Sequence, residues 1–176
     1  MQSIDRKKKT MNIVIKKANY RDPADASALV LLMDSYARDP MGGGKALPTE
    51  VKSCLAQSMA LMPHAFTILA FADEKAAGLI NCFEGFSTFA CKPLLNIHDV
   101  IVLEEYRGLG ISRLMLQAVE TEAKERGCCK LTLEVLEGNT VAQQAYRSFG
   151  FDDYRLDPEK GRALFWQKEL NHETPE

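Results

Sequence analysis

The chain has 176 residues, of which 46% are hydrophobic and 26% charged, with a formal net charge of −2. This length and composition suit a single globular domain, and the nearly balanced charge disfavours nucleic-acid and acidic-membrane partners. The sequence has no apolar run of about 18 residues that would span a bilayer and no apolar signal segment at its N-terminus, so we expect a cytoplasmic protein.

The first part of the chain is predicted to form a tail, a strand and a helix. Residues 1–11 contain a short basic run and are expected to be a flexible tail. Alternating apolar residues predict a strand over 12–18. Asp22 and Pro23 predict a helix start, because Asp can cap free amides and Pro suits the first turn, and the apolar stripe ends near Arg38.

A glycine-rich segment and a second helix come next. Gly42–Gly44 form either a flexible linker or a mobile lip over a substrate pocket. Thr49 is expected to cap a helix that Pro63 ends. Two strands, over 65–72 and 77–86, then form a hairpin.

A strand over 94–103 carries two polar residues among apolar ones, His98 and Asp99. Alternation predicts that His98, Val100 and Val102 share one face, and that Ile97, Asp99 and Ile101 share the other. A buried histidine satisfied by hydrogen bonds and a histidine at a functional site both fit this pattern. Glu84 in the preceding strand is either a solvated carboxylate or a further site residue.

The strand leads directly into Arg107-Gly108-Leu109-Gly110-Ile111-Ser112 and an amphipathic helix. The first amides of a helix lack intrahelical partners and lie at the positive end of its dipole, so this arrangement favours anion binding. The two glycines permit a tight turn, and the arginine adds a charge that suits phosphate. An ordinary turn is the simpler alternative. The loop lacks the third glycine of a dinucleotide fingerprint, and the chain has no P-loop.

The remaining elements are predicted from periodicity and capping signals. In chain order they are a helix over 111–126 ended by Gly127, a strand over 130–135, a helix over 140–149 capped by Asn139 and ended by Gly150, and a final strand pair over 151–155 and 163–169. We therefore expect one domain over 12–170, followed by a disordered tail over 171–176.

The five cysteines form no CxxC pair, and none lies near a histidine at metal-binding spacing. Reduced structural thiols and the absence of a metal site are therefore expected.

Three spaced motifs make residues 96–151 resemble the GCN5-related N-acetyltransferases, the GNAT family. The motifs are DVIVLEEYRGLGIS with the helix after it, CCKLTLEV, and GNTVAQQAYRSFGF. The resemblance implies an α/β (α+β) fold with a mixed central sheet of about six to seven strands and about four helices. It also implies a V-shaped splay between two central parallel strands, here 97–103 and 130–135.

The resemblance implies acetyl-CoA as cosubstrate and no metal. The family's Arg/Gln-x-x-Gly-x-Gly/Ala loop is represented by Arg107, Gly110 and Ser112, where serine departs from the pattern but is small. The residues implied to bind the cosubstrate are Ile101, Val102, Leu103, Arg107, Gly108, Leu109, Gly110, Ile111, Ser112, Asn139, Gln143 and Tyr146. From local rules alone, Asn139 is a helix cap and Tyr146 a core residue.

The activity implied is direct acetyl transfer to the primary amine of a small molecule, since the motif strand looks most like the small-amine branch. His98, which stands where that branch commonly has Glu, is the first candidate base. Asp99, Glu84 or water are the alternatives, and Tyr146 is the candidate acid. Acetylation of a protein lysine or N-terminus, a non-catalytic acyl-CoA-binding module, and a homodimer also remain open.

Overall fold

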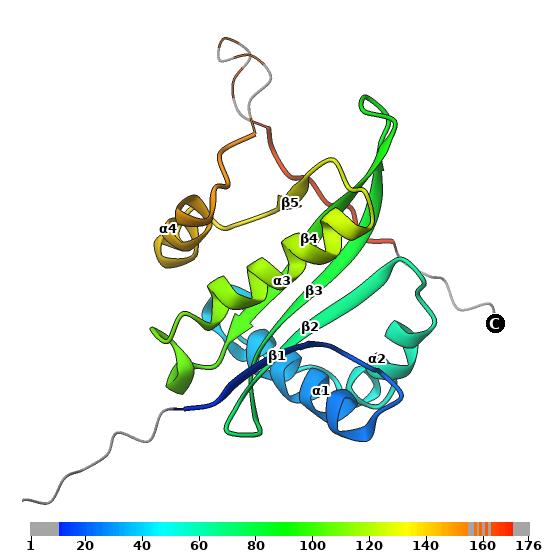
Figure 1. The fold of residues 1–176 in the computed structure, drawn as a ribbon, viewed down its shortest axis with the longest axis vertical. Coiled ribbons are helices and arrows are strands. Elements are labelled where there is room, and N and C mark those ends of the chain that lie inside the picture. Colours follow the sequence, from blue (N-terminus) through cyan, green and yellow to red (C-terminus); the bar gives the residue numbers. More distant parts are fainter. Residues whose placement is uncertain (1–10, 155–156, 158, 160, 162, 171–176) are drawn as a thin grey trace, which may run out of the picture.

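The computed structural model describes residues 11–154, 157, 159, 161 and 163–170, and the fold is a five-stranded mixed sheet with four α-helices (Figure 1). The elements in chain order are β1 (Ile13–Lys17), α1 (Pro23–Arg38), the 3₁₀ turn η1 (Pro40–Gly42), α2 (Thr49–Ala60), β2 (Ala65–Ala72), β3 (Lys75–Ser87), β4 (Lys92–Val102), the 3₁₀ turn η2 (Glu104–Tyr106), α3 (Ile111–Glu125), β5 (Leu131–Leu133) and α4 (Thr140–Phe149).

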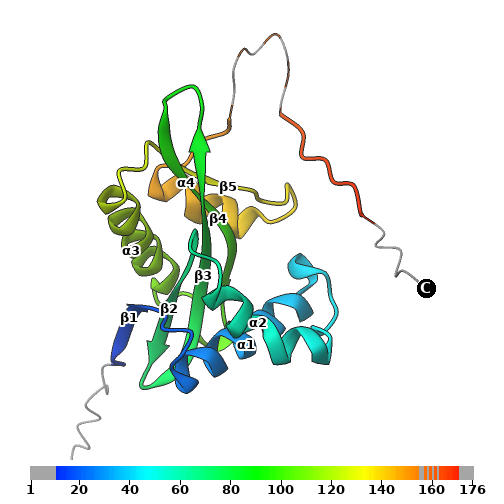
Figure 2. The same ribbon diagram turned by 90° about the vertical axis from the view of Figure 1, so that its right-hand side faces the viewer.

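The strands lie in the order β1-β2-β3-β4-β5. The first three neighbouring pairs are antiparallel, and β4 and β5 are parallel. The α1 and α2 helices cover one face of the sheet and α3 covers the other, as Figure 2 shows. Among the described helices, none is long and apolar enough to cross a bilayer.

Two apolar clusters hold these layers together, one on each face of the sheet. On the α1 side, Leu29 and Leu32 pack against Leu69 and Leu79, and all four side chains are fully buried. On the α3 side the cluster includes Met115, Leu116, Val119, Ile80 and Ile97. At about 25 cal/mol per Å² of apolar surface, this burial is the main stabilising term for the sheet and its helices.

The β4 strand contains a one-residue irregularity, a β-bulge, at His98. Asn81 of β3 pairs with Asp99, but the next β3 residue, Cys82, pairs with Ile97, so His98 has no partner on β3. An extra residue on one strand re-aims the side chains around it. The predicted alternation is therefore wrong here.

The side chains follow this shift. Ile97 packs in the α3-side cluster together with Val100 and Val102, and not with Ile101, which lies in the α1-side cluster. The His98 ring lies 5.3 Å from the ring of Phe83, which also packs on the α1 side. His98 and Asp99 consequently lie on the same side of the sheet.

The two parallel strands separate after a short paired stretch, which confirms the predicted splay. Leu95–Ile97 of β4 pair with Leu131–Leu133 of β5. Beyond that point β4 continues to Val102 beside β3, but the described residues give it no further partner on the β5 side. An unpaired strand edge therefore begins at the bulge and runs toward the loop before α3.

The fold class is confirmed, with two differences in detail. The sheet has five strands instead of six to seven, because 151–154 and 163–170, the described parts of the expected final pair, form no strand. The β5 strand is only three residues long and offers a short edge for pairing. The expected cap at Thr49 is also wrong, since Pro48 precedes α2 and no side chain caps that helix.

Candidate active site

The loop before α3 presents an open helix N-terminus. Gly108 and Gly110 have φ values of 79° and 76°, a left-handed conformation that glycine adopts without strain. Gly110 is the N-cap, and no side chain caps the helix. The first helical bond runs from the Leu114 amide to the Gly110 carbonyl at 3.1 Å, so the three preceding amides have no intrahelical acceptor. These donors, at the positive end of α3, suit a diphosphate.

Arg107 links this loop to two other elements. Its Nε donates to the Val102 carbonyl at 3.1 Å, and its terminal nitrogen donates to Oδ2 of Asp39 at 3.1 Å. The Met41 amide and the Arg107 guanidinium together hold the pKa of Asp39 below its usual range. Because the arginine side chain is still half exposed, it can also reach an anion bound at the loop.

The backbone of Val102 faces the unpaired edge of β4. Before the bulge, the Leu95 amide donates to the Lys130 carbonyl on the β5 side. After the bulge, the Leu103 amide donates instead to the Ala77 carbonyl on β3. Successive strand amides point in opposite directions, so the amide of Val102 points away from β3 and toward the splay. The bulge thus supplies an unpaired donor beside the anion loop.

Tyr146 lies on α4, and burial, with a smaller contribution from Tyr36, raises its pKa to about 12. Two polar residues fix the start of α4. Asn139 accepts a hydrogen bond from the Ala142 amide at 3.2 Å, and Gln143 donates to the carbonyls of Leu136 and Glu137 at 3.1 and 2.7 Å. Both residues therefore hold the loop between β5 and α4 in place.

A second group of polar side chains lies on the α1 side of the sheet. Burial and the carboxylates of Asp99 and Asp39 raise the pKa of Tyr36, which in turn contributes to the raised pKa of Tyr146. Tyr36 therefore lies close to groups from β4, the end of α1 and α4. Sequence reasoning placed Tyr36 only on an apolar stripe, and no local signal distinguished it from a core tyrosine.

The remaining candidate bases differ in their surroundings. His98 is exposed at the bulge, beside Phe83. Glu84 forms an ion pair with Arg126 at 3.0 Å. Arg126 is the C-cap of α3, and the 15 residues of that helix rise about 22 Å, so Glu84 is held near the end of α3 remote from the anion loop.

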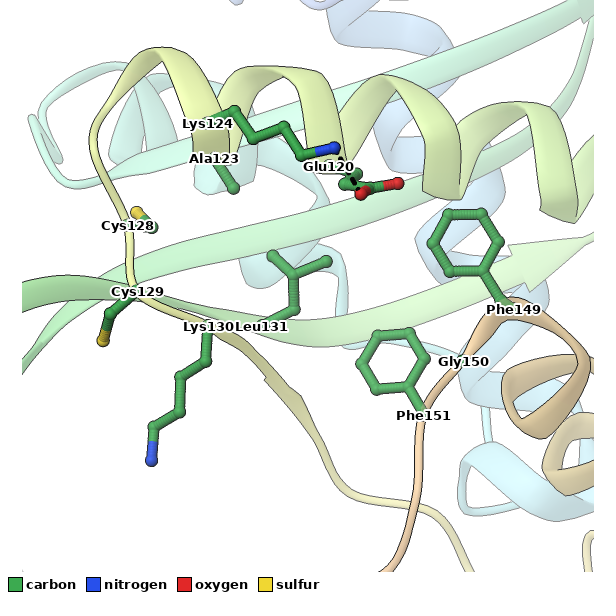
Figure 3. Close-up of a pocket in the computed structure, with 10 residues that line it drawn as sticks. All are labelled: Glu120, Ala123, Lys124, Cys128, Cys129, Lys130, Leu131, Phe149, Gly150 and Phe151. Carbon is green, nitrogen blue, oxygen red and sulfur yellow. Dashed lines mark ion pairs between the residues drawn. The ribbon is translucent and has the colours of Figure 1, made fainter.

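A cavity of about 330 Å³ lies between the C-terminal half of α3, the start of β5 and the end of α4 (Figure 3). Phe149 and Phe151 point into it, and an ion pair between Glu120 and Lys124 borders it. Its lining includes neither the anion loop nor Asp99 nor Tyr146. The groups described above therefore lie outside this cavity.

Similar proteins include two curated acetyltransferases. The chain is 38% identical over 87 residues to a streptothricin acetyltransferase of Streptomyces lavendulae, a match that covers 49% of this chain and 46% of that protein. It is 30% identical over 102 residues to an L-ornithine N5-acetyltransferase of Arabidopsis thaliana, covering 56% and 45%. The chain thus spans about half the length of these relatives.

A solved aminoglycoside N-acetyltransferase in complex with CoA has the same fold, with a TM-score of 0.71 at 17% sequence identity, and the match covers 91% of this chain and 97% of that chain. The family model described as "Acetyltransferase (GNAT) family" matches residues 29–151, which is more than half of the chain. With the open α3 N-terminus and the splayed parallel strands, this match shows that the chain belongs to the acetyltransferase (GNAT) family.

Proposed function

We propose that this protein transfers the acetyl group of acetyl-CoA directly to the primary amine of a small molecule. The observation that carries the proposal is the open N-terminus of α3 beside a strand edge that no described strand pairs, with Tyr146 packed against the apolar cluster that includes Ile111. Family membership supports acyl transfer as the reaction class. Five free cysteines suit a reducing compartment, for which we propose the cytoplasm.

The loop residues fit the diphosphate of CoA. The amides of Ile111, Ser112 and Arg113 supply donors, and Arg107 supplies a positive charge. A side-chain carbon at Gly108 or Gly110 would meet nothing within 4 Å, so the surface over the loop is open. Ser112 in place of Gly/Ala is compatible with this geometry, because its amide is the donor and its side chain is small.

The splayed strands fit the rest of the cosubstrate. The Val102 amide would donate to the acetyl carbonyl and stabilise negative charge on that oxygen in the transition state. The backbone of Ile101 to Leu103 would flank the pantetheine arm, with Leu109, Asn139 and Gln143 holding the loops on either side. Acetyl-CoA supplies the acetyl group and a thiolate leaving group.

Two proton transfers accompany the reaction. The acceptor amine must lose a proton, because an ammonium with a pKa of about 10 is not a nucleophile. We assign this step to His98 or Asp99, directly or through water, and leave Glu84 out because Arg126 engages it. The leaving thiolate must gain a proton, and the buried hydroxyl of Tyr146 is the proposed donor.

A cationic small molecule is the proposed acceptor. Arg107 engages Asp39, but Asp99 forms no ion pair within the described part of the chain, so its carboxylate makes this side of the site acidic. The related proteins named above act on streptothricin and on the N5 amine of L-ornithine, and the CoA complex is an aminoglycoside acetyltransferase. The similarity to these proteins supports an amine as the acceptor but does not identify which amine it is.

The test is to incubate the purified protein with acetyl-CoA and a panel of L-ornithine, polyamines, aminoglycosides and lysine-containing peptides. Mass spectrometry would detect any acetylated product, and calorimetry would measure acetyl-CoA binding. We expect tight acetyl-CoA binding and acetylation of at least one small amine. Acetylation of peptides alone would favour a protein acetyltransferase. Clear binding without any product would favour a non-catalytic acyl-CoA-binding module.

A further inference from the structure

A chain of four polar side chains crosses the apolar α1 side of the sheet and ends at Asp99. The hydroxyls of Tyr20 and Thr67 lie 2.9 Å apart, Thr67 Oγ1 donates to Asn81 Oδ1 at 2.6 Å, and Asn81 Nδ2 donates to Asp99 Oδ2 at 2.9 Å. Thr67 is fully buried and Asn81 is 3% exposed. The four residues come from the β1–α1 connection, β2, β3 and β4, which are brought together only by the sheet.

The chemistry of the groups fixes the direction of this network. A carboxylate can only accept, so the Asn81 amide nitrogen must face Asp99 and its oxygen must face Thr67. The single hydroxyl proton of Thr67 is then used on Asn81, and the Tyr20 hydroxyl must donate to Thr67. Each member therefore holds the next one in a single orientation.

Stability alone does not explain these residues. The strands already pair through their backbones, and neighbouring positions on this face are occupied by Leu69 and Leu79. Buried polar groups are costly unless every bond is made, and asparagine has low strand propensity. Apolar side chains would fill these positions at less cost, so the network has another use.

Asp99 is the only carboxylate in the network, and is therefore the member suited to bind a cation. Asn81 bonds one carboxylate oxygen, Oδ2, and Asp99 remains partly exposed. Within the described part of the chain, no lysine or arginine forms an ion pair with it. The buried Asp25, by contrast, pairs with Lys16 at 2.9 Å. A half-buried carboxylate held by a neutral amide is therefore available to a cation from outside the protein.

We propose that Tyr20, Thr67 and Asn81 are positioning residues that hold the Asp99 carboxylate as the binding group for the acceptor's ammonium. This inference rests on the proposed function, since it assigns the acceptor side of the same site, and it leaves deprotonation of the amine to His98 or to water. The bulge at His98 contributes, because it sets Asp99 directly opposite Asn81. The network would act on amine binding and not on the cosubstrate, whose proposed position is along the unpaired edge of β4.

The test is a double-mutant cycle of Asn81→Ala and Asp99→Asn, measured with the best amine from the panel. Asn81→Ala should raise the KM for the amine about tenfold, as expected for a lost hydrogen bond to a charged group, with kcat and acetyl-CoA affinity within about twofold of wild type. In the Asp99→Asn background the same change should have little further effect. An additive cycle, or a loss confined to kcat, would overturn the inference.

Thr67 provides a second test that does not depend on the larger change at Asn81. Thr67→Val keeps the shape but removes the hydroxyl, and should raise the KM for the amine about threefold to tenfold. Thr67→Ser keeps the hydroxyl and should stay near wild type. Thr121→Val, which removes a hydroxyl bonded to the Gln117 carbonyl on α3, is the matched control. If the Thr67→Val and Thr67→Ser variants had the same KM for the amine, the inference would be overturned.

Calorimetry with acetyl-CoA shows whether each variant is folded. If the wild type acetylates an amine but the cycle is additive, only the positioning role fails. If the wild type binds acetyl-CoA and acetylates no amine, the proposed function fails and the positioning role fails with it.

Discussion

Tyr146 keeps its proton at every pH at which the reaction is expected to run, because burial raises its pKa to about 12. The hydroxyl form is lost only above that pKa, so a proton is always available for a leaving thiolate. A raised pKa also makes the group a weaker acid, and donation is therefore expected to accompany departure of the sulfur and not to precede it.

Tyr146→Phe removes the hydroxyl and keeps the ring, which contacts Phe151 at a centroid distance of 6.0 Å. We expect kcat to fall about 10² to 10³-fold, within the usual range for general acid catalysis, while acetyl-CoA affinity stays within about twofold. Steady-state kinetics and calorimetry measure the two quantities. Weakened binding with normal turnover would contradict the assignment of Tyr146 as the acid.

We propose that the loop before α3 and the N-terminus of that helix act together as one anion-binding element. Ser112 is in the first turn, where an added negative charge favours the helix but repels a diphosphate. Because the two effects have opposite signs, a substitution at Ser112 can separate anion binding at the helix N-terminus from the stability of the helix.

Ser112→Asp should lower acetyl-CoA affinity about tenfold or more, because the new carboxylate lies beside the proposed diphosphate position. The melting temperature should be unchanged or slightly raised, since the charge complements the helix dipole. Ser112→Asn is the matched neutral control and should keep affinity within about threefold. Calorimetry and thermal unfolding provide the measurements. If the Asp and Asn variants bind equally well, the diphosphate lies elsewhere.

At the scale of the whole molecule, Asp34 joins α1 and α2, the two helices that cover one face of the sheet. Its carboxylate pairs with Lys52 of α2 at 2.8 Å and with Arg38 of α1 at 3.0 Å, and it accepts the Leu47 amide at 2.9 Å. Hydrogen bonds from Lys52, Arg38 and Leu47 lower the pKa of Asp34 to about 2. The Asp34 carboxylate therefore binds a proton less readily in the folded protein than in the unfolded chain.

The sign of the pH effect follows from that difference. The contribution of Asp34 to stability is fully present above its unfolded pKa of 3.8 and is lost as the pH falls toward about 2. Asp34→Asn should therefore lower the melting temperature at pH 6 more than at pH 3. Glu74→Gln, which removes an exposed carboxylate on the β2–β3 turn, is the control. An equal loss at both pH values would show that the ion pairs do not stabilise the folded state.

Local signals in the sequence determined much of the fold. Asp22 caps α1 as predicted, accepting the amides of Ala24 and Asp25, because a cap involves residues only two or three positions apart. Gly150 ends α4 in the left-handed conformation for the same reason. The turn between β4 and the uncapped start of α3 could also be predicted, since a strand, two glycines and a helix follow each other directly.

Tertiary structure alone decided how the site is completed. Arg107 meets Asp39 across 68 positions of sequence, Glu84 meets Arg126 across 42, and Asp99 meets Asn81 across 18. These contacts depend on how distant elements pack, and the contact between Asp99 and Asn81 also depends on strand register, which the bulge at His98 changes by one residue. The alternation of side chains along a strand contains no signal for such a shift in register. The sequence by itself therefore determined the proposed cosubstrate loop, whose parts are contiguous, whereas only the folded sheet decided which side chains lie on the proposed acceptor side.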